Sequence, residues 1–132
     1  MIELKNIRHW IFDLDNTLYP NTTNLFDKID DLMCQFIEEN LGVSKEEALK
    51  IKNTYFHDHG TTLNGLMKKN DIDADKFLEF VHDIDYTLLN KDEELGVQIE
   101  KLPGEKIIFT NGTRKHAQKV TERLGIEKHF TK

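Results

Sequence analysis

The sequence predicts an α/β fold in which parallel strands form a partial core and a helical cap is inserted between them. Two short apolar runs, one ending at Phe12 and one at residues 106–109, are each closed by polar turn residues, as buried strands are. The chain between them is far longer than a crossover helix needs, and its apolar residues recur at helical spacing. We therefore expect an incomplete α/β core from residues 1–20 and 93–132, and a helical cap from residues 21–92.

Composition narrows the class of protein further. With 132 residues, a net charge of −6 and a hydrophobic share of 38%, the chain has the size and balance of about one soluble, mildly acidic domain. It shows no basic face, so we expect no nucleic-acid polymer and no anionic membrane as partner. The single Cys34 excludes an internal disulfide and is expected to be a packed or half-exposed thiol rather than a nucleophile. With no signal-peptide pattern and no apolar run of membrane length, the predicted location is the cytoplasm.

Apolar spacing predicts four amphipathic helices in the cap: residues 25–41, a second from 44 towards 56, a third over 63–67, and a fourth from 77 that ends near residues 85–86. Gly42 is a stop signal for the first helix. Ser44 and Glu47 have the spacing of a capping box, which predicts the start of the second.

The segment His57-Asp58-His59-Gly60 breaks the helical period and carries a His-x-His spacing that a metal could use. A glycine at a helix junction explains it more simply, and we favour that structural interpretation. After the cap, a shorter helix from Asp92 is expected to end at the Pro103-Gly104 turn. A last helix carries Ala117, Val120 and Leu124 and ends at Gly125.

Asp13 and Asp15 follow the first predicted strand directly. Ligands of open parallel α/β sheets bind outside the carboxyl ends of the strands, so this position is functional as well as the residue type. Two carboxylates one residue apart repel each other, and Mg²⁺ bound by one or two carboxylates, waters and substrate phosphate would offset that repulsion. Taken alone, the pair is equally compatible with two solvated acids at a strand end.

Thr110, Asn111 and Gly112 follow the second strand and precede a helix. The Thr110 hydroxyl and backbone amides near Asn111 could donate hydrogen bonds to a phosphate oxygen, helped by the positive end of the helix. Alone, this segment is also compatible with an ordinary Asn-Gly turn. Together, the two turns favour a site that combines carboxylates and a metal with phosphate donors.

These two segments resemble motifs of the haloacid dehalogenase superfamily of phosphotransferases. Residues 11–18 are similar to that family's first motif, and residues 107–112 to its second. The order of these and other segments is most similar to the pyrimidine 5′-nucleotidase branch. The resemblance implies a Rossmann-like core with an inserted cap, phosphatase activity, and a nucleoside monophosphate or another small phosphorylated metabolite as substrate.

The resemblance also implies residue roles. Asp13 would be the nucleophile that forms an aspartyl-phosphate, with Mg²⁺ bridging it and the phosphoryl oxygens. Asp15 would protonate the leaving alcohol and then activate water, which requires a raised pKa, and would lend its backbone carbonyl to the metal. Thr110, Asn111 and Gly112 would bind the phosphate. A general acid at Asp15 favours phosphate-ester hydrolysis over dehalogenation.

The family pattern is not complete in these 132 residues. A lysine that neutralises nucleophile and phosphate, and further acids for the metal, would be expected beyond Lys132. We therefore expect the chain by itself to be an impaired enzyme, and its unpaired sheet edge to favour self-association. The alternative is a non-catalytic helical module that binds a partner and retains a vestigial Asp13-Asp15 site.

Overall fold

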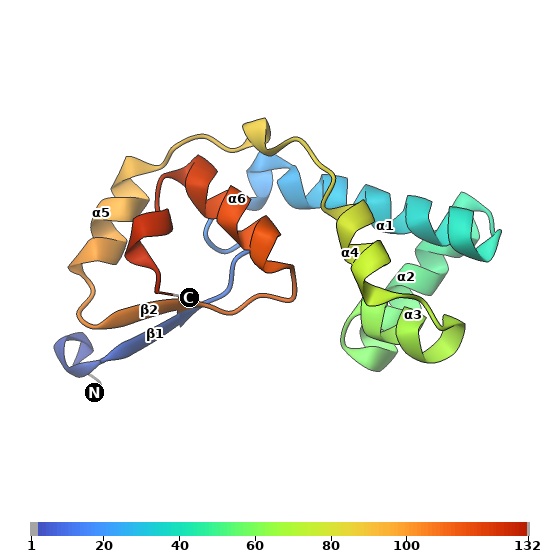
Figure 1. The fold of residues 1–132 in the computed structure, drawn as a ribbon, viewed down its shortest axis with the longest axis horizontal. Helices are drawn as coiled ribbons and strands as arrows, with labels where there is room; N and C mark the ends of the chain where they lie inside the picture. Colours follow the sequence, from blue (N-terminus) through green and yellow to red (C-terminus); the bar gives the residue numbers. More distant parts are fainter. Residues whose placement is uncertain (1–2, 132) are drawn as a thin grey trace. The chain divides into compact units, whose positions relative to one another are not determined.

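The computed structural model describes residues 3–131 and shows a mixed α/β protein, mostly helical, with one two-stranded parallel sheet among those residues. The strands and α-helices, labelled in Figure 1, are β1 (His9–Phe12), α1 (Leu25–Leu41), α2 (Lys45–His59), α3 (Thr62–Asn70), α4 (Ala74–Val81), α5 (Glu93–Lys101), β2 (Glu105–Ile108) and α6 (Arg114–Leu124). Short 3₁₀ turns are η1 (Leu4–Asn6), η2 (Asn21–Thr23), η3 (Tyr86–Leu88) and η4 (Glu127–His129).

The described chain forms two compact units. The strand unit comprises residues 3–26 and 85–131, and the helical unit comprises residues 27–84. Their identity as a catalytic core and its cap stays a prediction. Within residues 3–131, none of the helices has both the length and the apolar character needed to cross a membrane.

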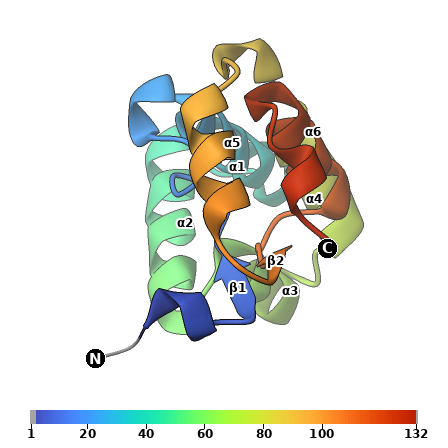
Figure 2. The ribbon, with the colours of Figure 1, turned by 90° about the vertical axis from the view of Figure 1, so that its left-hand side faces the viewer.

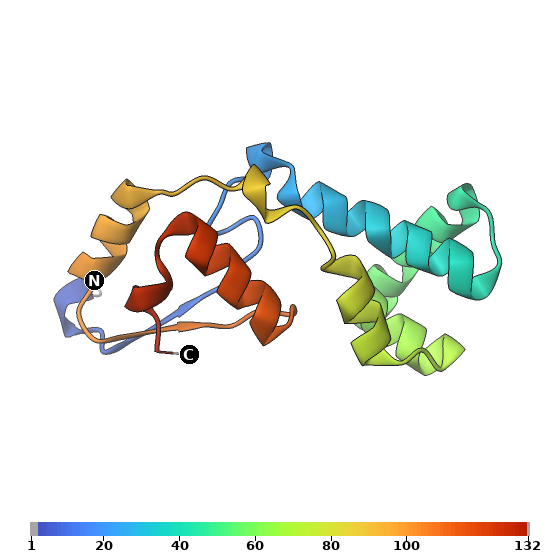
Figure 3. The ribbon, with the colours of Figure 1, turned by 45° about the horizontal axis from the view of Figure 1, so that its top comes forward.

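The sheet of the strand unit has β1 and β2 side by side in parallel register, with Phe12 opposite Ile108. Helices α5 and α6 lie on the same side of this sheet in the three ribbon views (Figures 1, 2 and 3). Trp10 and Phe12 are half-buried, whereas Ile11, which points to the opposite face, is 71% exposed. The exposed Ile11 lies on a face of the sheet, and self-association through the unpaired sheet edge stays a prediction.

The turn before β2 requires glycine. Gly104 has a φ of +91°, and a Cβ atom there would overlap the carbonyl oxygen of Arg8. The N–H of Glu105 donates to that same carbonyl at 2.8 Å, which starts the ladder. Strand β2 therefore begins at Glu105. It ends at Ile108, so both of its ends lie one residue earlier than the apolar run 106–109 suggests.

The helical unit has an apolar interior. Phe36 of α1 makes edge contacts with the rings of Phe77 and Phe80 in α4, at centroid distances of 5.1 and 5.5 Å. Gly65 of α3 packs so closely on Tyr55 of α2 that a side chain there would overlap it. Ring contacts between α1 and α4 and the close approach of α2 and α3 therefore stabilise the packing of these short helices, whose outer faces are polar.

Helix starts in this unit follow the capping chemistry in the sequence. The hydroxyl of Ser44 accepts from the N–H of Glu47 at 3.2 Å, which confirms its half of the expected capping box. Asp73 caps α4 in the same way. Helix α1 ends before Gly42, as predicted; this residue has a φ of +66°.

Two predicted helix ends are wrong. Helix α2 continues through His57 and Asp58 to His59, and Gly60, whose φ is +85°, is its C-cap, which confirms the expected glycine at a helix junction. The loss of apolar period there marks an exposed last turn, not a loop. Helix α4 ends at Val81 instead of near residues 85–86, because the chain turns there into η3, in which the N–H of Thr87 donates to the carboxylate of Asp85.

Candidate functional site

The predicted carboxylate and phosphate turns leave the sheet at the same edge. Asp13 and Asp15 follow β1, and Thr110, Asn111 and Gly112 follow β2. The strands are parallel, and the last ladder bond runs from the N–H of Phe109 to the carbonyl of Phe12 at 2.8 Å. The register thus brings both turns to the carboxyl end of the sheet, where α/β proteins bind ligands. The roles of the five residues stay predictions.

The turn after β1 exposes Asp13 and buries its neighbours. Leu14 and Leu18 are buried, and the N–H groups of Thr17 and Leu18 both donate to the carbonyl of Leu14. Asn16 takes the left-handed conformation, with a φ of +56°, that asparagine tolerates well. The Thr17 hydroxyl donates to Oδ2 of Asp13 at 3.1 Å. Two buried leucines therefore anchor a turn that presents an oriented carboxylate.

Asp15 lies in a buried polar network. Its Oδ1 accepts a hydrogen bond from the Tyr19 hydroxyl at 2.7 Å and lies 2.8 Å from Nε2 of His116. Nδ1 of His116 lies 2.7 Å from the hydroxyl of Tyr86. The His116 side chain is fully buried, and that of Asp15 is 16% exposed. Side chains from three segments of the strand unit thus form one network around a carboxylate oxygen.

Both tyrosines of this network hold their protons tightly. Burial raises the pKa of Tyr86 to about 12, and the nearby charge of Asp15 adds to the effect. Burial also raises the pKa of Tyr19 well above its usual range, assisted by the charge of Asp15 and the hydrogen bond to it. The two phenols therefore act as neutral hydrogen-bonding groups at neutral pH.

Sequence reasoning missed Tyr19, Tyr86 and His116. One signal for His116 was present: it lies four residues before Val120 and eight before Leu124, on the stripe that α6 buries. A histidine on a buried stripe needs polar partners. Those partners come from segments as many as 101 residues away, so no local pattern could name them.

The turn after β2 is ordered by its own hydroxyls. Oγ1 of Thr110 accepts from the N–H of Gly112 at 3.1 Å, and Oγ1 of Thr113 accepts from the N–H of His116 at 3.0 Å, which caps α6. A hydroxyl that accepts can still donate its own proton, so Thr110 remains suited to a phosphate oxygen. The start of α6 directly behind this turn adds the positive end of a helix.

The donor set at the strand end is suited to Mg²⁺ but not to a metal that needs a full cage of protein ligands. Among residues 3–131, no three His, Cys, Asp or Glu side chains are grouped to hold a metal ion, and His57 and His59 belong to no such group. Mg²⁺ needs less, because it keeps several waters and takes one or two carboxylates plus substrate phosphate. The exposed carboxylate of Asp13 fits that requirement, whereas Oδ1 of Asp15 is already held by protein donors.

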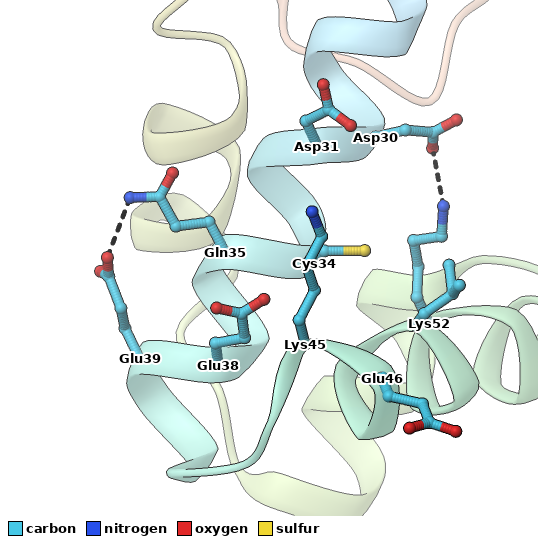
Figure 4. A pocket seen from close by; sticks show the side chains of 10 residues that line it. Asp30, Asp31, Cys34, Gln35, Glu38, Glu39, Lys45, Glu46 and Lys52 are labelled. Carbon is cyan, nitrogen blue, oxygen red and sulfur yellow. Dashed lines mark hydrogen bonds and ion pairs between the residues drawn. The ribbon is translucent and has the colours of Figure 1, made fainter.

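The helical unit contains a separate hollow of about 1080 Å³, drawn in Figure 4. Five of its ten lining residues are acidic and two are lysines; Asp30 pairs with Lys52 at 3.4 Å, and the thiol of Cys34 also lines the hollow. Cys34 is buried, as its packing pattern predicts, and burial raises the pKa of its thiol. Carboxylates repel a phosphate, so this hollow does not compete with the strand end as a phosphate site.

The structure defines a mixed α/β chain in which a turn with two aspartates and a turn with Thr110, Asn111 and Gly112 lie at the same end of a parallel sheet. No protein-family model matches the chain. The chain is similar to phosphate metabolism protein 8 of Saccharomyces cerevisiae, with 29% identity over 133 residues. The match covers 92% of this chain and 41% of the yeast protein, so the chain spans about two fifths of the length of that relative.

Proposed function

We propose that the chain carries the nucleophile half of a Mg²⁺-dependent phosphomonoester hydrolase site of the haloacid dehalogenase type. One observation carries the proposal: the β1–β2 register puts Asp13 and Asp15 at the same sheet edge as Thr110, Asn111 and Gly112. Similarity to a phosphate metabolism protein supports it. The proposed substrate is a nucleoside monophosphate or another small phosphate ester, and the proposed branch is the pyrimidine 5′-nucleotidases.

The proposed reaction has two steps. In the first, a carboxylate oxygen of Asp13 attacks phosphorus, a phosphorus–oxygen bond forms, and the ester bond to the alcohol breaks while Asp15 gives the alcohol a proton. In the second, Asp15 takes a proton from water, whose oxygen attacks phosphorus and releases phosphate and Asp13. The hydroxyl of Thr110 and the amides after it hold phosphoryl oxygens. Mg²⁺, when bound, would neutralise charge between Asp13 and the phosphoryl group.

Hydrolysis of p-nitrophenyl phosphate and uridine monophosphate, with Mg²⁺ and with chelator, tests this function. We expect slow, Mg²⁺-dependent turnover that Asp13→Asn abolishes, because the amide is not a nucleophile of comparable strength. Asp58→Asn is the matched control, since Asp58 is exposed in the last turn of α2. A wild-type rate no higher than that of Asp13→Asn would contradict the proposal and favour a non-catalytic binding module.

A further inference from the structure

We propose that His116 is a positioning residue for Asp15: its Nε2–H holds Oδ1 of the carboxylate, and Tyr86 fixes the ring from the other side. This inference rests on the proposed function, in which Asp15 exchanges a proton with the leaving alcohol. It assigns a role to a residue that belongs to neither of the two turns. His116 of α6 and Tyr86 of η3 would thus restrain Asp15 from outside its own turn.

The contacts leave the ring little freedom. Nε2 lies 2.8 Å from Oδ1 of Asp15, and Nδ1 lies 2.7 Å from the Tyr86 hydroxyl. The imidazole is fully buried, and the contacts of Tyr19 and His116 are both to Oδ1, so Oδ2 is the oxygen proposed to exchange a proton with the alcohol. Oδ1 accepts hydrogen bonds whether or not Oδ2 is protonated, so Nε2 carries the proton of that bond. Both ring nitrogens are therefore engaged. Because both nitrogens have partners, the ring has one orientation, and Nε2 contacts Asp15 from one direction.

The carboxylate is restrained in turn. Its Oδ1 receives the Tyr19 hydroxyl from its own turn and the ring from α6, on two sides of the same oxygen. Rotation of the carboxylate would break both hydrogen bonds at a side chain that is 16% exposed, and an unmade hydrogen bond in a mostly buried position is costly. Asp15 is thus held in one orientation before a substrate arrives, as a proton donor of a preorganised site requires.

Two variants separate this role from simple space filling. His116→Leu fills a similar volume without a donor, and His116→Gln retains an N–H near the position of Nε2. For uridine monophosphate we expect His116→Leu to lower kcat roughly tenfold to a hundredfold, with KM unchanged. His116→Gln should recover most of that loss. His57→Leu, at an exposed histidine of α2, is the control and should change neither constant.

A comparison of two substrates with different leaving groups tests the same variants in a second way. The alcohol of uridine monophosphate needs a proton as it departs, whereas p-nitrophenolate leaves without one. His116→Leu should therefore slow the release of uridine more than the release of p-nitrophenolate in a single turnover. Equal losses for both substrates, or equal rates for His116→Leu and His116→Gln, would overturn the positioning role.

A measurement without substrate or metal tests the geometry independently. In ¹⁵N-histidine NMR of the chain, the resonance lost in His116→Gln should show an Nε2-bound proton protected from exchange with water. Tyr86→Phe should shift that resonance and weaken the protection. An unprotected Nε2 proton in the wild type would overturn the inference. Absence of turnover in the wild type would instead contradict the proposed function, so the two failures can be told apart.

Discussion

Two histidine–aspartate pairs of similar length occupy opposite environments. His116 and Asp15, in the strand unit, lie 2.8 Å apart with side chains 0% and 16% exposed. His57 and Asp58, in the helical unit, lie 2.9 Å apart with side chains 88% and 54% exposed. Solvent screens the second pair, and water can replace either partner. Burial and additional hydrogen bonds, rather than distance, therefore distinguish the first pair, and we expect it to contribute more to stability.

The interiors of the two units also differ in their polarity. The helical unit packs aromatic rings, with Phe36 against Phe77 and Phe80. The strand unit places Asp15, His116 and two tyrosines together near its sheet. Buried polar networks give a unique geometry only when every member is satisfied. The proposed chemistry is therefore assigned to the strand unit, where this network lies.

The largest expected effect is in the helical unit. Phe77→Ala should lower the free energy of unfolding by about 3–5 kcal/mol, because it removes a buried ring and leaves a cavity beside Phe36. Urea unfolding followed by circular dichroism measures the loss. Phe56→Ala, at a ring that is 64% exposed, is the matched control and should have little effect. Equal losses would show that aromatic packing is not what holds this unit together.

The comparison of the two histidines gives the next effect. His116→Ala should cost on the order of 3 kcal/mol, because it leaves Asp15 and Tyr86 without a buried partner that each of them uses. His57→Ala should leave the unfolding transition unchanged. The same urea experiment compares them. A loss at His116 no larger than at His57 would remove the distinction between the pairs.

A third effect compares two glycines with positive φ, Gly104 before β2 and Gly42 after α1. Gly42→Ala should lower the free energy of unfolding by about 1 kcal/mol, because alanine is strained at a φ of +66° although no atom lies within 4 Å of its Cβ. Gly104→Ala should cost clearly more, because its Cβ also meets the backbone of Arg8 and the strand must shift. Thermal unfolding of the two variants measures the difference. Similar melting temperatures would mean that the turn before β2 adapts.

The smallest effect is a pH dependence above neutrality. Burial raises the pKa of Tyr86 from its ordinary value of 10.0 to about 12 in the folded chain, so its neutral form contributes stability below pH 10. That contribution is lost as pH rises from 10 through about 12. Tyr86→Phe should therefore lose less stability over this range than the wild type. Identical slopes, or a tyrosine absorbance titration without a late component assigned to Tyr86, would contradict the buried environment.

Local chemistry made much of the fold predictable. Gly42 and the cap at Ser44 mark helix ends through backbone geometry that a few neighbouring residues determine. The parallel strands followed from two apolar runs with polar ends, and the structure confirms the pair. The ends of α2 and α4 were less predictable, because apolar spacing reports which residues are buried and not where helical hydrogen bonds stop.

The candidate site was predictable only in its turns. Asp13 and Thr110 stand at strand ends, which sequence pattern locates. The network of Asp15, Tyr86 and His116 depends on contacts across as many as 101 residues, and on which face of α6 is buried. Such contacts arise from tertiary packing, so one sequence could suggest His116 only as a polar residue on a buried stripe.

The central claim is that Asp13 accepts a phosphoryl group, and the most direct test is to trap it there. The chain would be incubated with p-nitrophenyl phosphate and Mg²⁺, then treated with borohydride, which reduces an aspartyl-phosphate to homoserine. Mass spectrometry of the peptide that contains residues 13 and 15 should find homoserine at position 13, and none with chelator or in Asp13→Asn. An unmodified Asp13 at saturating substrate and Mg²⁺ would contradict the account.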